Sequence, residues 1–480
     1  METFSNIVSA VDSFVWGPVM LVLLVGTGIF LTVRIGFATW RNLPYALHSV
    51  FSKDARGTHR GTGDISPFAA LMTALAATIG TGNIVGVATA ILSGGPGAVF
   101  WMWVMALLGM MTSFSENVLG IFYRHKNEEG AWQGGAMYYL ADGLGRKKGC
   151  KQLGRVLAVL FAASCVLASF GMGNMSQINS IAGNLRAAFG VPELATGVVL
   201  AGCSAAVIFG GLKRVAAVAE RVVPLMALFY LGGALVVVLV HASAVPAAFA
   251  AIFRGAFGLA PAGGGVLGCG VARAVTWGFK RGAFSNEAGL GASVMVHSSS
   301  NVTEPVQQGM WGLFEVFADT LVVCTLTALV ILTSGLVDLE TGRAAAGVVG
   351  SALVGEAFST VFGSFGPKFI AVSILLFAYS TVLGWSQYGT KAVSYLLGPR
   401  AGGAYQAVFV GIMVVGAVMK LDLAWDLSDT FNGLMMLPNL VGVAGLSGTV
   451  ARITRNYAAR VFYGRDVAPL TASAPRPARR

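Results

Sequence analysis

Long apolar stretches separated by short polar segments dominate the chain, and this pattern predicts a helical protein that crosses a membrane many times. A transmembrane helix needs about 20 mainly apolar residues, and eleven segments meet that length. The first is too long for the apolar part of a signal peptide, and no basic residue precedes it. The expected spans are residues 14–34, 67–92, 99–123, 154–181, 195–211, 221–242, 266–290, 311–335, 368–396, 404–420 and 425–450.

Composition assigns the chain to the membrane proteins. Of its 480 residues, 55% are hydrophobic and 11% are charged, whereas a soluble domain carries about 25% charged residues. The five cysteines lie far apart, without a C-x-x-C or a Cys/His cluster, so we expect neither a disulfide framework nor a transition-metal site. Because a phosphate-binding loop, a soluble domain and a catalytic triad are also missing, we expect neither an enzyme nor a protein that uses ATP.

The basic residues predict the orientation of the chain in the bilayer. A net charge of +11 suggests nucleic acid or lipid as a partner, but cytoplasmic loops of membrane proteins also collect Lys and Arg. With the N-terminus outside, 26 of the 32 basic residues fall on the inner side. We therefore expect an outer N-terminus, a cytoplasmic C-terminus and no nucleic-acid partner. The basic residues left outside are Arg186, Arg254, Arg273, Arg343, Lys368 and Lys420.

The second expected span is interrupted at bilayer depth by Ile79-Gly80-Thr81-Gly82-Asn83. Backbone groups freed in hydrocarbon must find other partners, so such a break needs a reason. Taken alone, it has two interpretations. Gly82 and Gly86 form a GxxxG pattern that lets helices approach closely, or the helix stops in order to build a binding site. A dinucleotide fingerprint is excluded by the glycine spacing and by the lack of a βαβ unit.

A second interrupted span lies five spans later, in KRGAFSNEAGLGAS (280–293), which contains Ser285, Asn286 and Glu287 between glycines and apolar residues. Since five is odd, the two halves of the chain are inverted relative to the membrane. Paired glycine-interrupted spans are the best sequence indication of the binding site of a secondary transporter. Unwound backbone offers carbonyls to a cation, and a helix N-terminus offers N–H groups to an anion.

Six motifs then carry a family resemblance. In order between residues 67 and 390, they are LMTALAATIGTGNIVGVATAI, GGPGAVFWMWVMALLGM, GGAMYYL, FGMGNMSQINS, KRGAFSNEAGLG and FAYSTVLGWSQYG. Together they resemble the alanine or glycine:cation symporter family, the sodium:alanine symporters. One departure is Ala136, where the family commonly has proline. It lies in an expected cytoplasmic loop, away from the expected binding site.

The resemblance implies an all-α polytopic membrane protein with about 11 transmembrane helices, in a LeuT-type five-plus-five inverted repeat with one extra N-terminal helix. The expected parts are 1–66 (extra helix and cytoplasmic loop), 67–242 (first repeat), 243–450 (second repeat) and 451–480 (disordered basic tail). It also implies sodium-coupled symport of alanine or glycine into the cell, across the plasma or inner membrane of a bacterium or archaeon. Sodium is then the co-transported ion.

The candidate substrate residues come from both breaks. Free amides and short hydroxyls suit a carboxylate, so we expect the first break to hold the carboxylate of the amino acid. The substrate then bridges to the second break. The residues expected in this role are Thr78, Gly80, Thr81, Gly82 and Asn83 in the first break, and Ser285 and Asn286 in the second.

The resemblance to the wider fold also implies a sodium ion near the carbonyls of Ala76 and Ile79, with the hydroxyls of Ser380 and Thr381 as partners. Without that resemblance, hydroxyls in a span more often bond the carbonyl one turn back.

The pocket wall is expected from spans 4 and 9. Phe170, Asn174, Gln177 and Ser180 recur at helical spacing and share one face, which either bonds neighbouring helices or lines a cavity. We expect Phe170 and Gln177 to line the pocket. Trp385 with Phe170 would exclude larger side chains by steric repulsion.

Ionisable residues within spans are functional candidates by default. Glu287 either accepts hydrogen bonds from unwound amides, pairs with a basic residue of its span (Arg273, Lys280 or Arg281), or contacts the substrate amine. Glu116, Glu315 and Asp319 are expected to pair with other helices or to hold gates. Two other functions stay open: a proton-coupled amino-acid carrier in which a buried acid takes the proton, and a sodium-permeable channel or transporter-like sensor.

Overall fold

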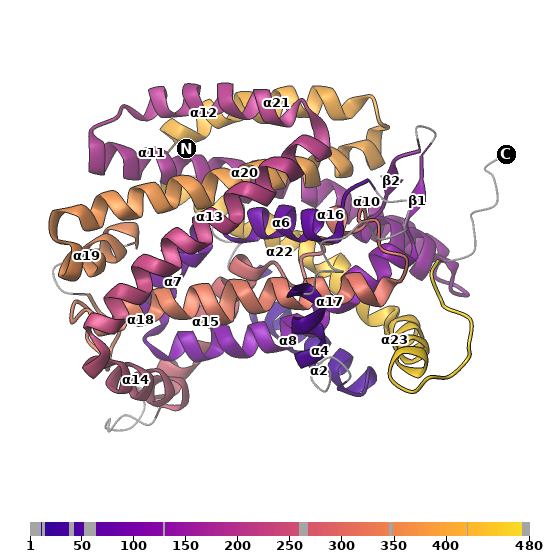
Figure 1. The fold of residues 1–480 in the computed structure, drawn as a ribbon, viewed down its shortest axis with the longest axis horizontal. Helices are drawn as coiled ribbons and strands as arrows, with labels where there is room; N and C mark the ends of the chain where they lie inside the picture. Colours follow the sequence, from indigo (N-terminus) through magenta and orange to yellow (C-terminus); the bar gives the residue numbers. More distant parts are fainter. Residues whose placement is uncertain are drawn as a thin grey trace.

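The computed structural model describes residues 11, 15–37, 43–51, 64–127, 130–258, 267–344, 348, 350–419 and 421–472, and this part of the chain is mostly helical (Figure 1). Two short strands, β1 (His125–Lys126) and β2 (Trp132–Gln133), pair antiparallel. The α-helices are α2 (Pro18–Arg34), α4 (Leu43–Phe51), α6 (Pro67–Thr78), α7 (Val85–Gly94), α8 (Gly97–Phe122), α9 (Ala136–Tyr138), α10 (Lys151–Phe170), α11 (Ser176–Phe189), α12 (Glu193–Ile208), α13 (Gly211–Val240), α14 (Val245–Phe257), α15 (Leu267–Asn286), α16 (Val294–His297), α17 (Pro305–Val316), α18 (Thr325–Thr333), α19 (Gly350–Phe362), α20 (Gly366–Leu397), α21 (Ala401–Val418), α22 (Leu421–Gly445) and α23 (Ser447–Val461).

Each of the eleven expected spans overlaps at least one of these helices. Within the described ranges, six helices or continuous helix pairs are long and apolar enough to cross a membrane. A seventh is added if residues 428–445 and 447–461, which meet at 57°, count as one span. The structure therefore confirms a polytopic helical protein, and the count of eleven crossings stays a prediction.

Some helices lie where none was expected. α14 and α19 occupy segments between the expected spans. Ser447–Val461 forms α23 although a disordered tail was expected from residue 451, and this part of the prediction is wrong. The physical reason is an apolar stripe, formed by Val450, Ile453 and Tyr457, which packs into the protein core. Residues 473–480 of that tail lie outside the described part of the chain.

The helices pack in two groups with α6 between them. α8 packs against α15 and α17, while α12 packs against α21, and α11 against α20. In Figure 1 the α12–α21 pair and the α8–α15 pair lie along opposite edges of the molecule, and α6 lies near its centre. α6 contacts both α20 and α17. A break just after α6 is therefore placed where the two groups meet.

The outer surface of the helices carries large apolar side chains. Leu225, Leu228 and Leu239 on α13 are 63–73% exposed, and Val199 on α12 is 62% exposed. Soluble monomers rarely expose apolar surface in such contiguous patches. Lipid tails are the solvent that makes these positions favourable, which agrees with the composition.

A buried cluster of charges ties α15 to α22. Lys280 Nζ lies 2.9 Å from Asp429 Oδ2, and Arg281 Nη2 lies 3.0 Å from the same oxygen. Trp16 Nε1 donates to the Asp429 carbonyl at 3.0 Å. Lys280 and Arg281 were counted among the basic residues of the inner side, but they lie within α15 and partner Asp429, so they do not report orientation. They also do not pair with Glu287.

Replacing Asp429 by Asn should destabilise the protein by about 3–5 kcal/mol, because two buried cations then lose their counter-charge. Thermal unfolding in detergent measures the loss. Glu193→Gln is the matched control, because Glu193 pairs with Arg186 at 3.1 Å in an exposed position, where an ion pair contributes about 0–1 kcal/mol. Equal melting temperatures for the two variants would contradict the role of Lys280, Arg281 and Asp429 in holding the two helices.

Candidate functional site

The first break begins where α6 ends. Ser66 caps the start of α6 by accepting the Ala69 amide at 3.0 Å, and Pro67 occupies its first turn. The helix runs to Thr78, Ile79 turns to an extended conformation, and one 3₁₀ turn (Thr81–Asn83) precedes α7. The interruption predicted at 79–83 is confirmed.

Side chains replace the helical partners of the broken backbone. The Gly80 amide donates to Asn83 Oδ1 at 3.0 Å, and the Thr81 amide donates to Gln177 Oε1 of α11 at 3.2 Å. In an uninterrupted helix, these two amides would donate to the carbonyls of Ala76 and Ala77. The break therefore leaves the carbonyls of Ala76 and Ala77 without these two helical donors. A residue with a side chain does not fit at position 80, because its Cβ would lie 2.5 Å from Thr381 Oγ1.

The second break follows α15, which ends at Asn286. Glu287 has φ +56°, and Gly289 and Gly291 also have positive φ. A left-handed glutamate is uncommon and marks strain that the surroundings must hold. Asn286 helps to hold it by accepting the Ala288 amide at 3.0 Å, and the helical path resumes at α16.

The two breaks meet each other. A Cβ on Gly82 would lie 3.2 Å from the Cα of Ser285, so glycine permits the close approach. The Asp319 carboxylate joins them, because it accepts a hydrogen bond from Asn83 Nδ2 at 2.6 Å and another from Ser285 Oγ at 2.8 Å. Gly82, Asn83, Ser285 and Asp319 are all buried. Asn286 lies one step away and donates to the Thr320 hydroxyl at 3.1 Å.

Asp319 is the site residue that sequence reasoning placed least well. The sequence predicts that Asp319 pairs with another helix or holds a gate, but it does not identify the partner residue. It lies in a stretch of π-helix (Phe317–Cys324) between α17 and α18, and Thr320 Oγ1 also donates to it at 2.8 Å. An acid within a span was the available signal. Its partners are far away in sequence, so spacing alone could not identify them.

The expected sodium residues divide between two environments. The Thr381 hydroxyl lies 3.4 Å from the Ile79 carbonyl and 3.1 Å from the Phe377 carbonyl, so α20 reaches the first break. The Ser380 hydroxyl donates to Phe377 at 2.8 Å and lies 3.4 Å from the sulfur of Met226. Ala76 is buried on α6. The structure thus brings Ile79 and Thr381 together, with Ser380 directed toward α13.

The two expected wall residues lie in different surroundings. Trp385 Nε1 donates to Glu287 Oε1 at 2.7 Å, and a Cβ on Gly173 would lie 2.4 Å from the Cβ of Trp385. Phe170 instead packs against the rings of Tyr405 and Phe409 on α21, with ring centroids 5.3 and 6.2 Å away. A π-turn at Gly171–Met175 separates Phe170 from Gln177 and changes the helical register between them.

Span 4 therefore does not present one polar face. Asn174 donates to the Phe409 carbonyl at 2.7 Å, Ser180 to the Ser176 carbonyl at 2.8 Å, and only Gln177 reaches the first break. Thr78, on α6, donates to the Ala74 carbonyl at 3.2 Å. A regular period of about 3.6 residues predicted a shared stripe, and the π-turn is the reason it fails.

Two buried polar atoms at the breaks have no hydrogen-bond partner within the described residues: the Thr81 hydroxyl and Glu287 Oε2. Buried polar groups are almost always satisfied, so each of these two atoms indicates a place for a polar ligand. Thr81 is in the first break and Glu287 in the second.

A set of contacts, defined below as the clamp, holds the segment that follows the second break. Arg124, just after α8, donates to the carbonyls of Ser298 (3.0 Å), Ser300 (2.5 Å) and Val302 (2.9 Å), and its guanidinium lies 4.1 Å from the ring centroid of Trp132. Burial lowers the pKa of Arg124 to about 10, which leaves it charged at neutral pH. Charge-assisted bonds of this kind are about twice as strong as neutral ones.

The clamp also includes the chain before α6. Lys391 Nζ donates to the Met295 carbonyl at 2.7 Å and to Ser299 Oγ at 2.5 Å. Ile65 forms a parallel bridge with Ser300, and the Asn301 amide donates to the Ile65 carbonyl at 2.9 Å. We call the contacts of Arg124, Lys391 and residue 65 with residues 295–302 the clamp.

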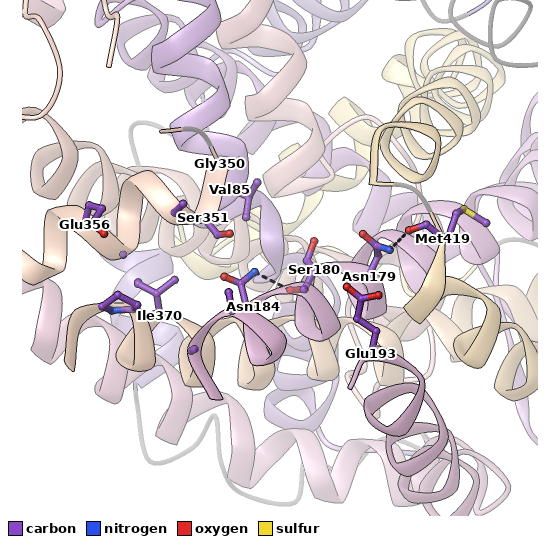
Figure 2. Close-up of a pocket in the computed structure, with 16 residues that line it drawn as sticks. Val85, Asn179, Ser180, Asn184, Glu193, Gly350, Ser351, Glu356, Ile370 and Met419 are labelled. Atoms are coloured by element: carbon purple, nitrogen blue, oxygen red, sulfur yellow. Dashed lines mark hydrogen bonds between the residues drawn. The ribbon is translucent and has the colours of Figure 1, made fainter. Parts of the chain in front are cut away.

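A cavity of about 550 Å³ lies at the start of α7 (Figure 2). Val85, two residues after Asn83, and Ser180, three after Gln177, both line it. Glu193 and Glu356 bring acidic groups to its wall, and Asn184 donates to the Ser180 carbonyl beside it. α6 begins at the clamp, and α7 begins at the cavity. The first break separates these two helices and therefore lies between the clamp and the cavity.

Broken helices joined at a buried carboxylate, inside a protein with an apolar exterior, are the construction of a membrane transporter. The chain belongs to the Sodium:alanine symporter family, whose sequence profile matches residues 1–468. This is a family of transporters and not a class of enzymes, and its members co-transport sodium with an amino acid.

Relatives of known name agree with this assignment. The chain is 45% identical to the sodium/alanine symporter AgcS of Methanococcus maripaludis, over 95% of this chain and 97% of that protein. It is 35% identical to the amino-acid carrier protein AlsT of Bacillus subtilis, over 97% and 95%. Among solved structures, a Na⁺-coupled sialic acid symporter matches with a TM-score of 0.46 and 12% identity, over 95% of this chain and 94% of that one.

Replacing Arg124 by Gln should loosen the clamp, because three carbonyls lose a charged donor. We expect the amides of residues 299–302 to exchange with deuterium about tenfold faster or more, since hydrogen bonds to charged groups contribute about 1.5–3 kcal/mol each. Lys126→Gln is the control, because Lys126 is exposed and lies 5.4 Å from the same Trp132 ring. Unchanged exchange in Arg124→Gln would show that the clamp does not depend on this residue.

Proposed function

We propose that the protein is a secondary active transporter that carries alanine or glycine into the cell together with sodium, by alternating access. The single observation that carries this proposal is the meeting of two broken helices at the Asp319 carboxylate, which accepts from Asn83 and Ser285. Family membership and the similarity to a sodium/alanine symporter support it. The proposed architecture is eleven transmembrane helices, with residues 67–242 and 243–450 as inverted repeats, an outer N-terminus and a cytoplasmic C-terminus.

The chemistry of an amino acid fits the two breaks. Its carboxylate needs hydrogen-bond donors, and the first break offers the Thr81 hydroxyl, which has no other partner among the described residues. Backbone amides of Gly80, Thr81 and Gly82 are the further donors in the proposal, with Thr78 and Asn83 beside them. Each amide that now bonds a side chain can exchange that partner for the ligand.

A sodium ion or the ammonium group of the substrate needs acidic groups instead of hydrogen-bond donors. Asp319 and Glu287 are buried acids at the breaks, and the basic residues nearest in sequence, Lys280 and Arg281, are occupied by Asp429. A sodium ion or the ammonium of the substrate can neutralise Asp319, whereas an unpaired buried carboxylate is costly. Ser285 and Asn286 complete the side of the second break.

Sodium is proposed to bind between α6 and α20. The carbonyls of Ala76 and Ile79 and the hydroxyls of Ser380 and Thr381 are all oxygen ligands, which a hard cation prefers. Support comes from the 3.4 Å approach of Thr381 to the Ile79 carbonyl, and from the loss of helical donors to the end of α6. Ser380 would have to turn away from Phe377 to join them.

Alternating access is supported by the difference between the two ends. The cavity reaches Val85 beside the first break, while the clamp seals the segment after the second break. We infer that the cavity faces the outside in this conformation. Transport then requires the clamp to open and the cavity to close, with α6, α7, α8, α15, α17 and α18 moving against the remaining helices.

Uptake into proteoliposomes tests the function. With an inward sodium gradient, radiolabelled alanine should accumulate above its outside concentration, because the gradient drives it through the coupling of the two ligands. Alanine that only equilibrates would indicate a channel or sensor. Accumulation driven by a proton gradient without sodium would favour the proton-coupled carrier and contradict the sodium assignment.

Replacing Ser380 and Thr381 together by Ala should raise the sodium concentration for half-maximal uptake by about tenfold, equal to about 1.4 kcal/mol of binding free energy. Ser373→Ala is the matched control, because Ser373 is buried on the same helix and its hydroxyl bonds the Phe369 carbonyl one turn back. If the double variant and the control have the same sodium dependence, these hydroxyls are not ligands.

Replacing Trp385 by Phe should admit larger amino acids, so that the excess of alanine over leucine in competition falls by about tenfold, the range that a few methylene groups control. Phe170→Leu provides the comparison. If Trp385 and Phe170 both form the pocket wall, Phe170→Leu should widen the substrate range as much as Trp385→Phe does. If the contacts of Phe170 with Tyr405 and Phe409 dominate, the substrate range should widen less. An unchanged substrate range in Trp385→Phe would assign the pocket size to another residue.

A further inference from the structure

We propose that His297, Gln308 and Glu315 form a proton-binding site, separate from the two breaks, through which pH sets the affinity for sodium. The proposal rests on the proposed function for its effect on sodium, while proton binding itself is a property of the three side chains. It differs from a proton-coupled carrier, because the proton modulates sodium binding and does not replace it.

The three side chains make an isolated polar contact between α16 and α17. His297 Nε2 lies 3.0 Å from Glu315 Oε2, and His297 Nδ1 lies 2.5 Å from the amide nitrogen of Gln308. All three are 0–1% exposed. Glu315 Oε1 and Gln308 Oε1 have no hydrogen-bond partner among the described residues. The contact therefore holds unused hydrogen-bonding capacity in a place that excludes water.

This geometry accommodates two protonation states with the same heavy-atom positions. When Gln308 donates to Nδ1, the imidazole is neutral and its Nε2–H donates to Glu315. A half-turn of the amide brings Oε1 to the position of the nitrogen, where it accepts from a protonated Nδ1–H. The added proton comes from water and stays on Nδ1, and the result is an imidazolium between the Gln308 oxygen and the Glu315 carboxylate. The amide is thus a partner for either state.

The charged groups near His297 lie on the elements packed against α16. Of the elements packed against α16, α8 contributes Glu116 and, just after its end, Arg124, while α20 contributes Lys391 and Tyr388. α6 contributes no titratable side chain. Arg124 and Lys391 donate to the backbone and the hydroxyl of the clamp segment. This leaves Glu315 as the acid in direct contact with His297.

A proton here acts on the breaks through charge. Glu315, near the end of α17, and Asp319, where the two breaks meet, are four residues apart on one continuous helical path, so their carboxylates are neighbours that interact electrostatically. A positive charge on His297 partly neutralises Glu315 and so lowers the negative potential at Asp319 that attracts sodium. By linkage, sodium binding must in turn weaken proton binding. Because His297 lies within the clamp segment, residues 295–302, opening of the clamp would give the site access to water.

Proton binding is measured without transport. In protein labelled with ¹⁵N-histidine, the signal absent from His297→Gln identifies this side chain among the five histidines. Spectra are recorded from about pH 8 to about pH 5, and the proposal requires the neutral Nε2–H form to give way to the imidazolium form on acidification. Gln308→Leu should move the midpoint to lower pH, because Nδ1–H loses its acceptor. A neutral imidazole throughout this range, or a midpoint that Gln308→Leu does not move, would overturn the proposal.

The effect on sodium is measured in proteoliposomes. The sodium concentration for half-maximal alanine uptake should rise on the order of fivefold from pH 8 to pH 5.5, the lower range of coupling between sites, and His297→Gln should remove most of this rise. His241→Gln, at the end of α13, is the control and should keep it. An equal rise in His297→Gln would overturn the coupling. Absence of alanine uptake at every pH would instead refute the proposed function and leave the titration of His297 as the test of proton binding.

Discussion

The structure depends on one constraint, which is that a helix broken inside the bilayer must have its freed backbone groups satisfied by other parts of the chain. In the first break, Asn83 and Gln177 accept from the two amides that leave the helix. In the second, Asn286 accepts from the Ala288 amide, and Asn439 of α22 donates to the Gly289 carbonyl at 2.8 Å. Amide side chains on α11 and α22 are thereby fixed against the breaks, and their helices with them.

The same constraint governs the buried charges. Asn439 also donates to Glu116 at 2.5 Å, so a single amide satisfies a carbonyl of the second break and an acid of α8. Asp429 is neutralised by two cations of α15, whereas Asp319 receives only neutral donors from the described part of the chain. A carboxylate that is well hydrogen-bonded but lacks a counter-charge is prepared for a mobile cation. This contrast separates the acid that holds helices together from the acid at the centre of the candidate site.

Local features were predictable from the sequence, and distant contacts were not. Glycine and short polar residues in an apolar span were sufficient to predict both breaks, because glycine permits positive φ, as at Gly289 and Gly291, and close approach, as at Gly82. The partners of Asp319 are Asn83 and Ser285, 236 and 34 residues away, and nothing in their spacing reveals the contact. The prediction of one polar face on span 4 was wrong for another reason. The π-turn in this helix changes the helical period of about 3.6 residues on which the prediction relied. The sodium role proposed for Thr381 comes from the family resemblance, because its helical environment alone leaves that role ambiguous.

Breaking the first helix also gives its two halves different neighbours. The chain leading into α6 is held by the clamp through Ile65, whereas α7 begins at the wall of the cavity. A continuous helix would couple these ends as one rigid rod. With the break between them, a ligand that bonds Ile79 and the surroundings of Asn83 acts on the junction itself, and its binding energy can favour one relative position of the halves over another. A ligand site at the break, as proposed, would therefore let binding energy reach both the clamp and the cavity.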